Sequence, residues 1–327
     1  MANSNFHYQR RYDWPPLGNN KVADFLDHSL SSGQLAQTYI FVGPDGLGKS
    51  TLAQAFANNL LLSDGQEALS GANSDLYILE RPAGKKDIPV DLTRDFIKML
   101  SLSSFLGSYK IGIIKEAETL NANSANSLLK TLEEPREKVV IILLTNSLTA
   151  LPSTLVSRAQ VLYFTPVPYA IIYDYLLEEK KVDRASAKNL AALAAGRPLE
   201  AVRLLEEPEY YEAQLDSARS FLGFFSQSLI ERSATLKKIG PLDRDQVESL
   251  ISSWQRVWRD LLLLRLNQPE LIQYAALKEE LATVNLQLAE QDWFYYYQLA
   301  DMLLTAQKYL AANVSPATVL EQVIFNL

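Results

Sequence analysis

The 327-residue sequence contains no cysteine and only two histidines, His7 and His28. The absence of thiols excludes disulfide bonds, cysteine-ligated metal sites and cysteine nucleophiles. With two histidines, neither a histidine-based metal site nor a Ser–His–Asp triad is expected. No apolar run approaches the roughly 20 residues needed to cross a bilayer, and the charged N-terminal stretch has no signal-peptide core. We therefore expect a cytoplasmic protein without a membrane segment.

Positive charge is not in excess either, since 31 Lys and Arg against 38 Asp and Glu give a formal net charge of -7. The basic residues form scattered pairs, whereas a dedicated DNA-binding domain usually shows a basic stripe. Hydrophobic residues make up 48% of the chain and charged residues 21%. That composition is typical of globular proteins and excludes a disordered chain. The length predicts about two or three domains.

Five short apolar runs alternate with helical patterns in the first half of the chain, an order typical of a parallel α/β sheet. The predicted strands span residues 38–42, 76–79, 110–114, 139–144 and 160–164, and the predicted helices between them span 50–62, 93–100 and 123–134. Because runs such as 139–142 are apolar throughout, we expect the sheet to be covered on both faces.

The strand signal ends after Pro166 and Pro168, and the rest of the sequence has helical periodicity. Three short helices are predicted at 169–179, 184–194 and 199–205, followed by longer ones at 211–227, 243–266, 268–285, 293–313 and 315–327. The last third is rich in aromatic residues, including Trp254, Trp258 and the run Trp293 to Tyr297. Their helical spacing favours core packing over a partner-binding face.

One motif indicates nucleotide binding: GPDGLGKS, at residues 43–50, fits G-x-x-x-x-G-K-[ST] without a mismatch between a predicted strand and a predicted helix. Its glycines let backbone N–H groups and the helix N-terminus surround a phosphate. Lys49 would reach the β- and γ-phosphates, and the Ser50 hydroxyl would ligate Mg²⁺. The alternative is a glycine-rich turn with a solvated lysine. The predicted nucleotide-binding residues are Gly43, Pro44, Asp45, Gly46, Leu47, Gly48, Lys49, Ser50 and Thr51.

Two neighbouring strand ends could complete this site. A second-strand acidic residue normally holds Mg²⁺, but the strand at 110–114 is followed by Lys115 and then Glu116. A lysine would supply charge without coordinating the ion, so efficient hydrolysis is not expected, and Glu116 is the remaining catalytic candidate. Thr145 ends the next strand and would bond a γ-phosphate or the attacking water. The alternatives are a solvent-facing Glu116 and a locally satisfied Thr145.

The segments LLKTLEEP at 128–135 and LVSR at 155–158 resemble the bacterial clamp-loader AAA+ family of DNA polymerase III. The resemblance is specific over about 17–165 and weaker to about 205, and the segment 254–264 is similar to the collar of the family's delta-prime branch. It implies an α/β AAA+ P-loop domain with a five-stranded parallel sheet at 1–165, a small helical lid at 166–208, and an all-α collar at 209–327 that joins subunits.

The resemblance also implies site residues and partners. Arg158 would be an arginine finger that enters the ATP site of a neighbouring subunit, while Leu199 falls where a second sensor arginine is expected. The family's four-cysteine zinc module is missing, so no zinc is expected. The implied partners are the gamma/tau and delta subunits, the sliding clamp and, through the assembled complex, primed DNA.

The function implied is that of a delta-prime-like subunit, which helps ATP-driven loading of the sliding clamp and binds ATP with Mg²⁺ but hydrolyses it weakly or not at all. Polymerase activity would belong to the holoenzyme. One alternative is a hydrolysing gamma/tau-type ATPase, and another is a non-enzymatic scaffold with a relict phosphate loop.

Overall fold

The structure, a computed structural model, describes residues 10–63, 75–82, 84–102, 109–133, 138–240 and 242–327. The chain divides into two compact units. The first contains the residues up to 168 together with 197–199, and the second contains 169–196 and 200–327. Residues 64–74, most of the segment 63–75 where the resemblance would place a zinc module, lie outside the described residues, as do residues 134 and 135 of the LLKTLEEP motif. No helix in the described ranges is long and apolar enough to span a membrane.

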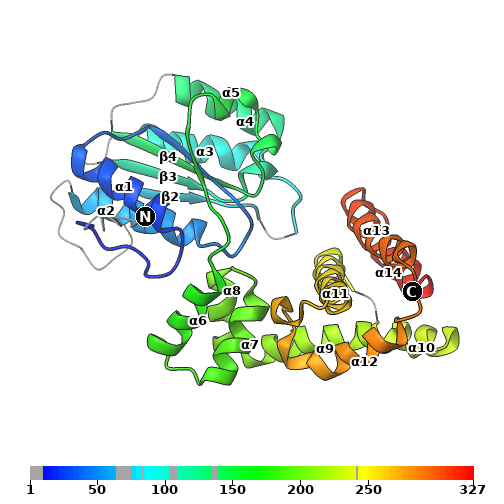
Figure 1. The fold of residues 1–327 in the computed structure, drawn as a ribbon. Helices are drawn as coiled ribbons and strands as arrows, with labels where there is room; N and C mark the ends of the chain where they lie inside the picture. Colours follow the sequence, from blue (N-terminus) through cyan, green and yellow to red (C-terminus); the bar gives the residue numbers. More distant parts are fainter. Residues whose placement is uncertain (1–9, 64–74, 83, 103–108, 134–137, 241) are drawn as a thin grey trace. The chain divides into compact units, whose positions relative to one another are not determined.

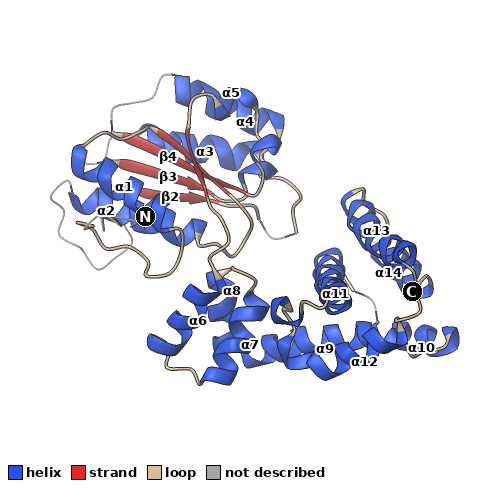
Figure 2. Ribbon diagram, in the orientation of Figure 1, coloured by secondary structure: helices blue, strands red, loops and turns tan. Residues whose placement is uncertain are grey.

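The first unit is built on a parallel five-stranded sheet with the strand order β2-β3-β4-β1-β5 (Figures 1 and 2). The strands are β1 (Thr38–Val42), β2 (Leu76–Leu79), β3 (Lys110–Ile114), β4 (Val139–Thr145) and β5 (Gln160–Tyr163). The helices are α1 (Asn20–Ser32), α2 (Lys49–Ser63), α3 (Val90–Ser101), α4 (Ala122–Glu133) and α5 (Ser153–Val156), with 3-10 turns η1 (Ala117–Thr119) and η2 (Leu148–Ala150). The predicted five-stranded parallel sheet is confirmed.

Both faces of the sheet are buried, as the unbroken apolar strands predict. In β1, Tyr39 and Phe41 join one core with residues of α1 and α2, whereas Ile40 and Val42 join a second core with residues of α3 and α4. Alternate side chains point to opposite faces of a strand, so each strand contributes to two cores. This sandwich holds the carboxyl ends of β1, β3 and β4 at one edge, where the phosphate loop begins.

The second unit contains only helices among its described residues (Figure 2). They are α6 (Tyr169–Glu178), α7 (Arg184–Ala194), α8 (Pro198–Glu206, which starts in the first unit), α9 (Pro208–Phe224), α10 (Leu229–Ile239), α11 (Arg244–Arg265), α12 (Lys278–Gln287), α13 (Trp293–Ala311) and α14 (Pro316–Phe325), with 3-10 turns η3 (Pro269–Leu271) and η4 (Ala275–Leu277).

The helix α11 supplies the aromatic core of this unit. Trp254 is fully buried and stacks on Phe221 of α9 with ring centroids 5.4 Å apart. One turn further along α11, Trp258 stacks on Tyr296 of α13 at 5.0 Å. Core packing is therefore confirmed for these aromatic residues. Trp293, Phe294 and Tyr297, in contrast, are 55%, 63% and 66% exposed.

One helix prediction for this region was wrong, and one helix of the structure was not predicted. The single helix predicted at 268–285 begins only at Lys278, because the preceding segment forms the turns η3 and η4. The buried carboxylate of Asp260 accepts hydrogen bonds from the backbone N–H groups of Gln273 and Tyr274, both at 2.8 Å, and holds the chain in this non-helical path. The helix α10 was missed, although Ser228 and Glu231 form a capping box at its start.

Candidate nucleotide-binding site

The phosphate loop connects β1 to α2, in the strand–loop–helix context that its motif requires. Gly43 leaves the strand with φ of 152°, and a Cβ atom there would lie 2.4 Å from the backbone oxygen of Phe164, just beyond β5. Only glycine fits so close to another backbone. The Gly43 N–H also donates to the carbonyl of Thr145 at 3.1 Å. The loop is thus fixed between β4 and β5.

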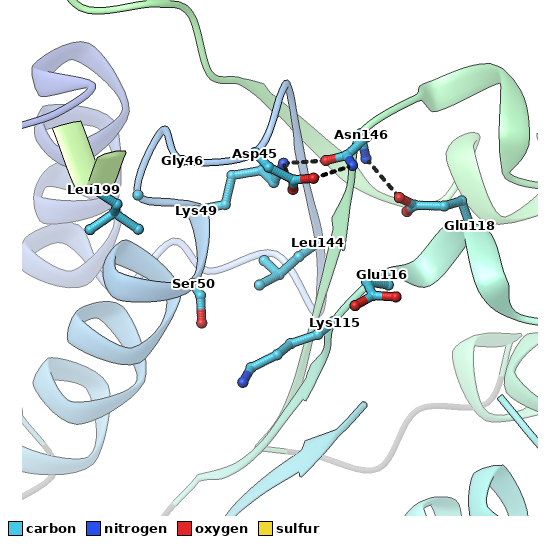
Figure 3. A pocket seen from close by; sticks show the side chains of 11 residues that line it. Asp45, Gly46, Lys49, Ser50, Lys115, Glu116, Glu118, Leu144, Asn146 and Leu199 are labelled. Atoms are coloured by element: carbon cyan, nitrogen blue, oxygen red, sulfur yellow. Dashed lines mark hydrogen bonds and ion pairs between the residues drawn. The ribbon is translucent and has the colours of Figure 1, made fainter. Parts of the chain in front are cut away.

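The side chain of Lys49, the first residue of α2, is held inside this loop. Its Nζ donates to the carbonyl oxygens of Gly43 and Pro44 and, at 2.6 Å, to Oδ1 of Asn146 (Figure 3). The Asp45 carboxylate lies 3.5 Å from the same amine. Burial lowers the pKa of Lys49, and the charge of Asp45 and its hydrogen bond to the amine partly oppose that shift. The amine is therefore a desolvated cation positioned at the phosphate loop.

Asn146, at the end of β4, joins the loop to the neighbouring strand (Figure 3). Its Nδ2 donates to Asp45 at 2.8 Å, and its backbone N–H faces Oε1 of Glu118 at 3.4 Å. The preceding Thr145, the predicted sensor-like residue, is 1% exposed and exchanges hydrogen bonds with Ser147 through its hydroxyl. The polar strand-end side chain that reaches the pocket is thus Asn146.

The end of β3 brings one cation and two carboxylates to the same pocket. Lys115 lines it, with Nζ 2.8 Å from a carboxylate oxygen of Glu80. Glu116, the predicted acidic residue, also lines it, but its backbone has φ of 49° and its carboxylate is paired with Arg81 at 2.6 Å. Glu118 presents Oε2 as a buried atom without a hydrogen-bond partner. Sequence reasoning chose Glu116, whereas the 3-10 turn η1 also brings Glu118 into the pocket.

These residues enclose a pocket of about 200 Å³. It is lined by Asp45, Gly46, Gly48, Lys49, Ser50, Lys115, Glu116, Glu118, Leu144, Asn146 and Leu199. Five of the nine predicted nucleotide-binding residues line the pocket, while Leu47 is buried in the core with α1 and α2. Gly43, Pro44 and Thr51 are not among the lining residues. The pocket therefore has the cations, backbone and helix N-terminus that bind phosphate groups.

Of the two positions assigned by the resemblance, Leu199 lies at the pocket and Arg158 does not. Leu199 lines the pocket, and its backbone N–H donates to the carbonyl of Gly46 at 3.1 Å. Arg158 is exposed between α5 and β5, where its guanidinium donates to the carbonyl of Thr154 at 3.0 Å, and it does not line the pocket of its own chain.

The donor set fits a magnesium ion poorly. Mg²⁺ at a phosphate site is held by one or two carboxylates together with phosphate oxygens and waters, so the state of each single carboxylate decides the fit. Ser50 supplies one hydroxyl, but Glu116 is paired with Arg81, and an amine stands where an acidic ligand is expected.

Comparisons with known proteins agree with this architecture. Residues 18–168 match the family model described as DNA polymerase III, delta subunit. The chain is 34% identical to DNA polymerase III subunit delta' of Pseudomonas aeruginosa over 185 residues, which cover 52% of this chain and 56% of that protein. It is 24% identical to DNA polymerase III subunit gamma of Buchnera aphidicola over 75% of this chain and 74% of that one. The match thus spans little more than half the length of the delta' relative.

A solved structure shares the fold. The DNA polymerase III gamma subunit-related protein of Thermotoga maritima superposes with a TM-score of 0.52 at 17% identity, over 91% of this chain and 97% of that one.

Proposed function

Because this chain is a member of the DNA polymerase III clamp-loader family, we propose that it acts as a delta-prime-type subunit of a clamp loader. The sequence resemblance is confirmed by the family match over 18–168 and by the delta' and gamma relatives. In this role the chain assembles in the cytoplasm with gamma/tau and delta subunits. The complex then uses ATP to place the sliding clamp on primed DNA. The described residues form two compact units, and the further division of the helical unit into a lid and a collar is part of this proposal.

Its own pocket binds nucleotide but turns it over poorly. The observation that supports this is that one pocket combines two features. The phosphate loop is complete, with Lys49 in place, and the end of β3 contributes the amine of Lys115. Efficient hydrolysis needs a well-held metal and an oriented water. Glu116 is paired with Arg81, and Leu199 supplies no charge to the pocket. The described pocket therefore retains its phosphate-binding groups, while its strand-end acidic residue is replaced by Lys115 and the next one is engaged by Arg81.

The catalytic contribution of the chain is made to a neighbouring subunit through Arg158. Its exposure after α5 supports this role, since a guanidinium that acts in trans must be accessible to another chain. A finger supplied in trans stabilises charge on the transferred phosphoryl group and raises turnover by about 10³–10⁵.

The test is the DNA-stimulated ATPase of a reconstituted clamp loader carrying Arg158→Ala. We expect an assembled complex, seen by size-exclusion chromatography, whose ATPase falls by at least the share of one site. The matched control is Arg94→Ala, because Arg94 is an exposed arginine of the same domain that pairs with Asp91 at 3.6 Å. Unchanged ATPase in an assembled Arg158→Ala complex would refute the finger assignment.

A gamma/tau-type ATPase is the second candidate, supported by the match to the Buchnera aphidicola gamma subunit over three quarters of both chains. It requires that the isolated chain hydrolyse ATP at a measurable rate. The third, a scaffold with a relict loop, requires that Lys49 and its pocket have no affinity for nucleotide.

A further inference from the structure

We infer that the pocket binds a nucleoside di- or triphosphate without a divalent metal, with the amine of Lys115 supplying the positive charge that Mg²⁺ would otherwise bring. This inference rests on the proposed nucleotide binding and specifies the ionic form of the ligand. It follows from the poor fit of the donor set to a metal ion.

Two amines, those of Lys49 and Lys115, belong to residues that line one pocket. Lys49 extends from the start of α2, and Lys115 extends from the end of β3 into the pocket that Ser50 also lines (Figure 3). The Lys115 side chain is 34% exposed, and the Glu80 carboxylate with which it pairs is 62% exposed. A surface ion pair of this kind contributes little stability. Lys115 can therefore exchange Glu80 for a phosphate oxygen at small cost.

Two of the three carboxylates at the pocket are already engaged by other side chains. Asp45 is bonded to Asn146 and lies near Lys49, while Glu116 is paired with Arg81. Glu118 lines the pocket, and its Oε2 is a buried atom without a hydrogen-bond partner. Magnesium at a phosphate site takes one or two carboxylates together with the phosphates, and here Lys115 stands at the strand end that would normally supply one. The Glu118 carboxylate repels a phosphate chain that carries no metal ion, and the amines of Lys49 and Lys115 must outweigh this repulsion.

A bound magnesium ion would compete with the Lys115 amine for the same part of the pocket. A magnesium ion carried by the nucleotide would approach Ser50 and the end of β3, where Lys115 lines the pocket. Two cations at one place repel each other, and the lysine is covalently fixed. A metal-free phosphate chain, in contrast, gains a charge-assisted hydrogen bond from each amine.

The experiment measures the affinity of the full-length chain for ADP by isothermal titration calorimetry, in EDTA and in excess Mg²⁺. We expect binding in EDTA to be at least as tight as in excess Mg²⁺, because the ion occupies the phosphate oxygens that Lys49 and Lys115 would bind. Lys115→Met should weaken binding about 10- to 100-fold in both buffers, since a hydrogen bond to a charged group is worth about 1.5–3 kcal/mol. Lys115→Asp should bind weakly in EDTA and recover affinity when Mg²⁺ is added.

Lys98→Met is the matched control, because Lys98 is an exposed lysine of the same domain that does not line the pocket. Thermal unfolding followed by circular dichroism shows whether each variant is folded. Wild-type binding that requires Mg²⁺ would overturn the inference and leave nucleotide binding intact. Absence of ADP binding in both buffers would overturn the proposed nucleotide binding together with it.

Discussion

Gly43→Ala is the substitution that most directly tests how the phosphate loop is held. The new Cβ would lie 2.4 Å from the carbonyl oxygen and 3.0 Å from the Cβ of Phe164, so it would meet backbone rather than a mobile side-chain end. Overpacking costs about 1–3 kcal/mol, and an unfavourable backbone conformation costs a further 1–3 kcal/mol. We therefore expect the first unit to lose about 2–6 kcal/mol of unfolding free energy.

Thermal unfolding followed by circular dichroism measures this loss. A domain of 150–250 residues loses about 2–4 °C of melting temperature for each kcal/mol, so the expected decrease is at least about 4 °C. Gly48→Ala is the matched control, since Gly48 lies in the same loop with φ of 85° but has no atom within 4 Å of an added Cβ. If both variants lose the same stability, contact with Phe164 is not what requires glycine at position 43.

Three further predictions concern charge and packing. Burial lowers the pKa of Lys49, so ADP affinity should fall as the pH rises towards 10.5, earlier than for an ordinary lysine. Lys49→Arg should move the fall in affinity to higher pH, because a guanidinium stays charged; an unchanged pH profile would contradict this reasoning. Trp254→Ala should cost about 3–5 kcal/mol in urea unfolding, whereas exposed Trp293→Ala should cost little. Gly112→Ala should lower the melting temperature, because its Cβ would lie 2.5 Å from Phe96; an unchanged one would refute it.

Much of the first unit could be predicted from the sequence because its signals are local. The strand at 38–42, the phosphate loop and the helix beginning at Lys49 follow from an apolar run, three glycines and a lysine in a fixed order. Thr145 and Asn146 show where sequence reasoning stops. Both are polar and adjacent at the end of β4, and only the structure shows that the first bonds Ser147 while the second bonds Lys49.

The helical unit shows the same limit. The periodicity around residues 268–285 fits a helix, but the fully buried Asp260 on α11 captures the backbone N–H groups of this segment. That contact joins residues 13 and 14 positions apart and leaves no periodic signal in the sequence. The Glu116–Arg81 ion pair is likewise long-range. It engages the acidic residue that, judged only from its position after the strand, would be a metal ligand.

Steady-state ATP turnover by the purified chain, measured beside ATP binding with Lys49→Ala as the control, tests the delta-prime-type assignment most directly. We predict binding that is lost with Lys49→Ala and turnover that is negligible in the absence of partner subunits. Robust turnover by the isolated chain would contradict the assignment and identify a gamma/tau-type motor, in which Lys115 does not prevent hydrolysis.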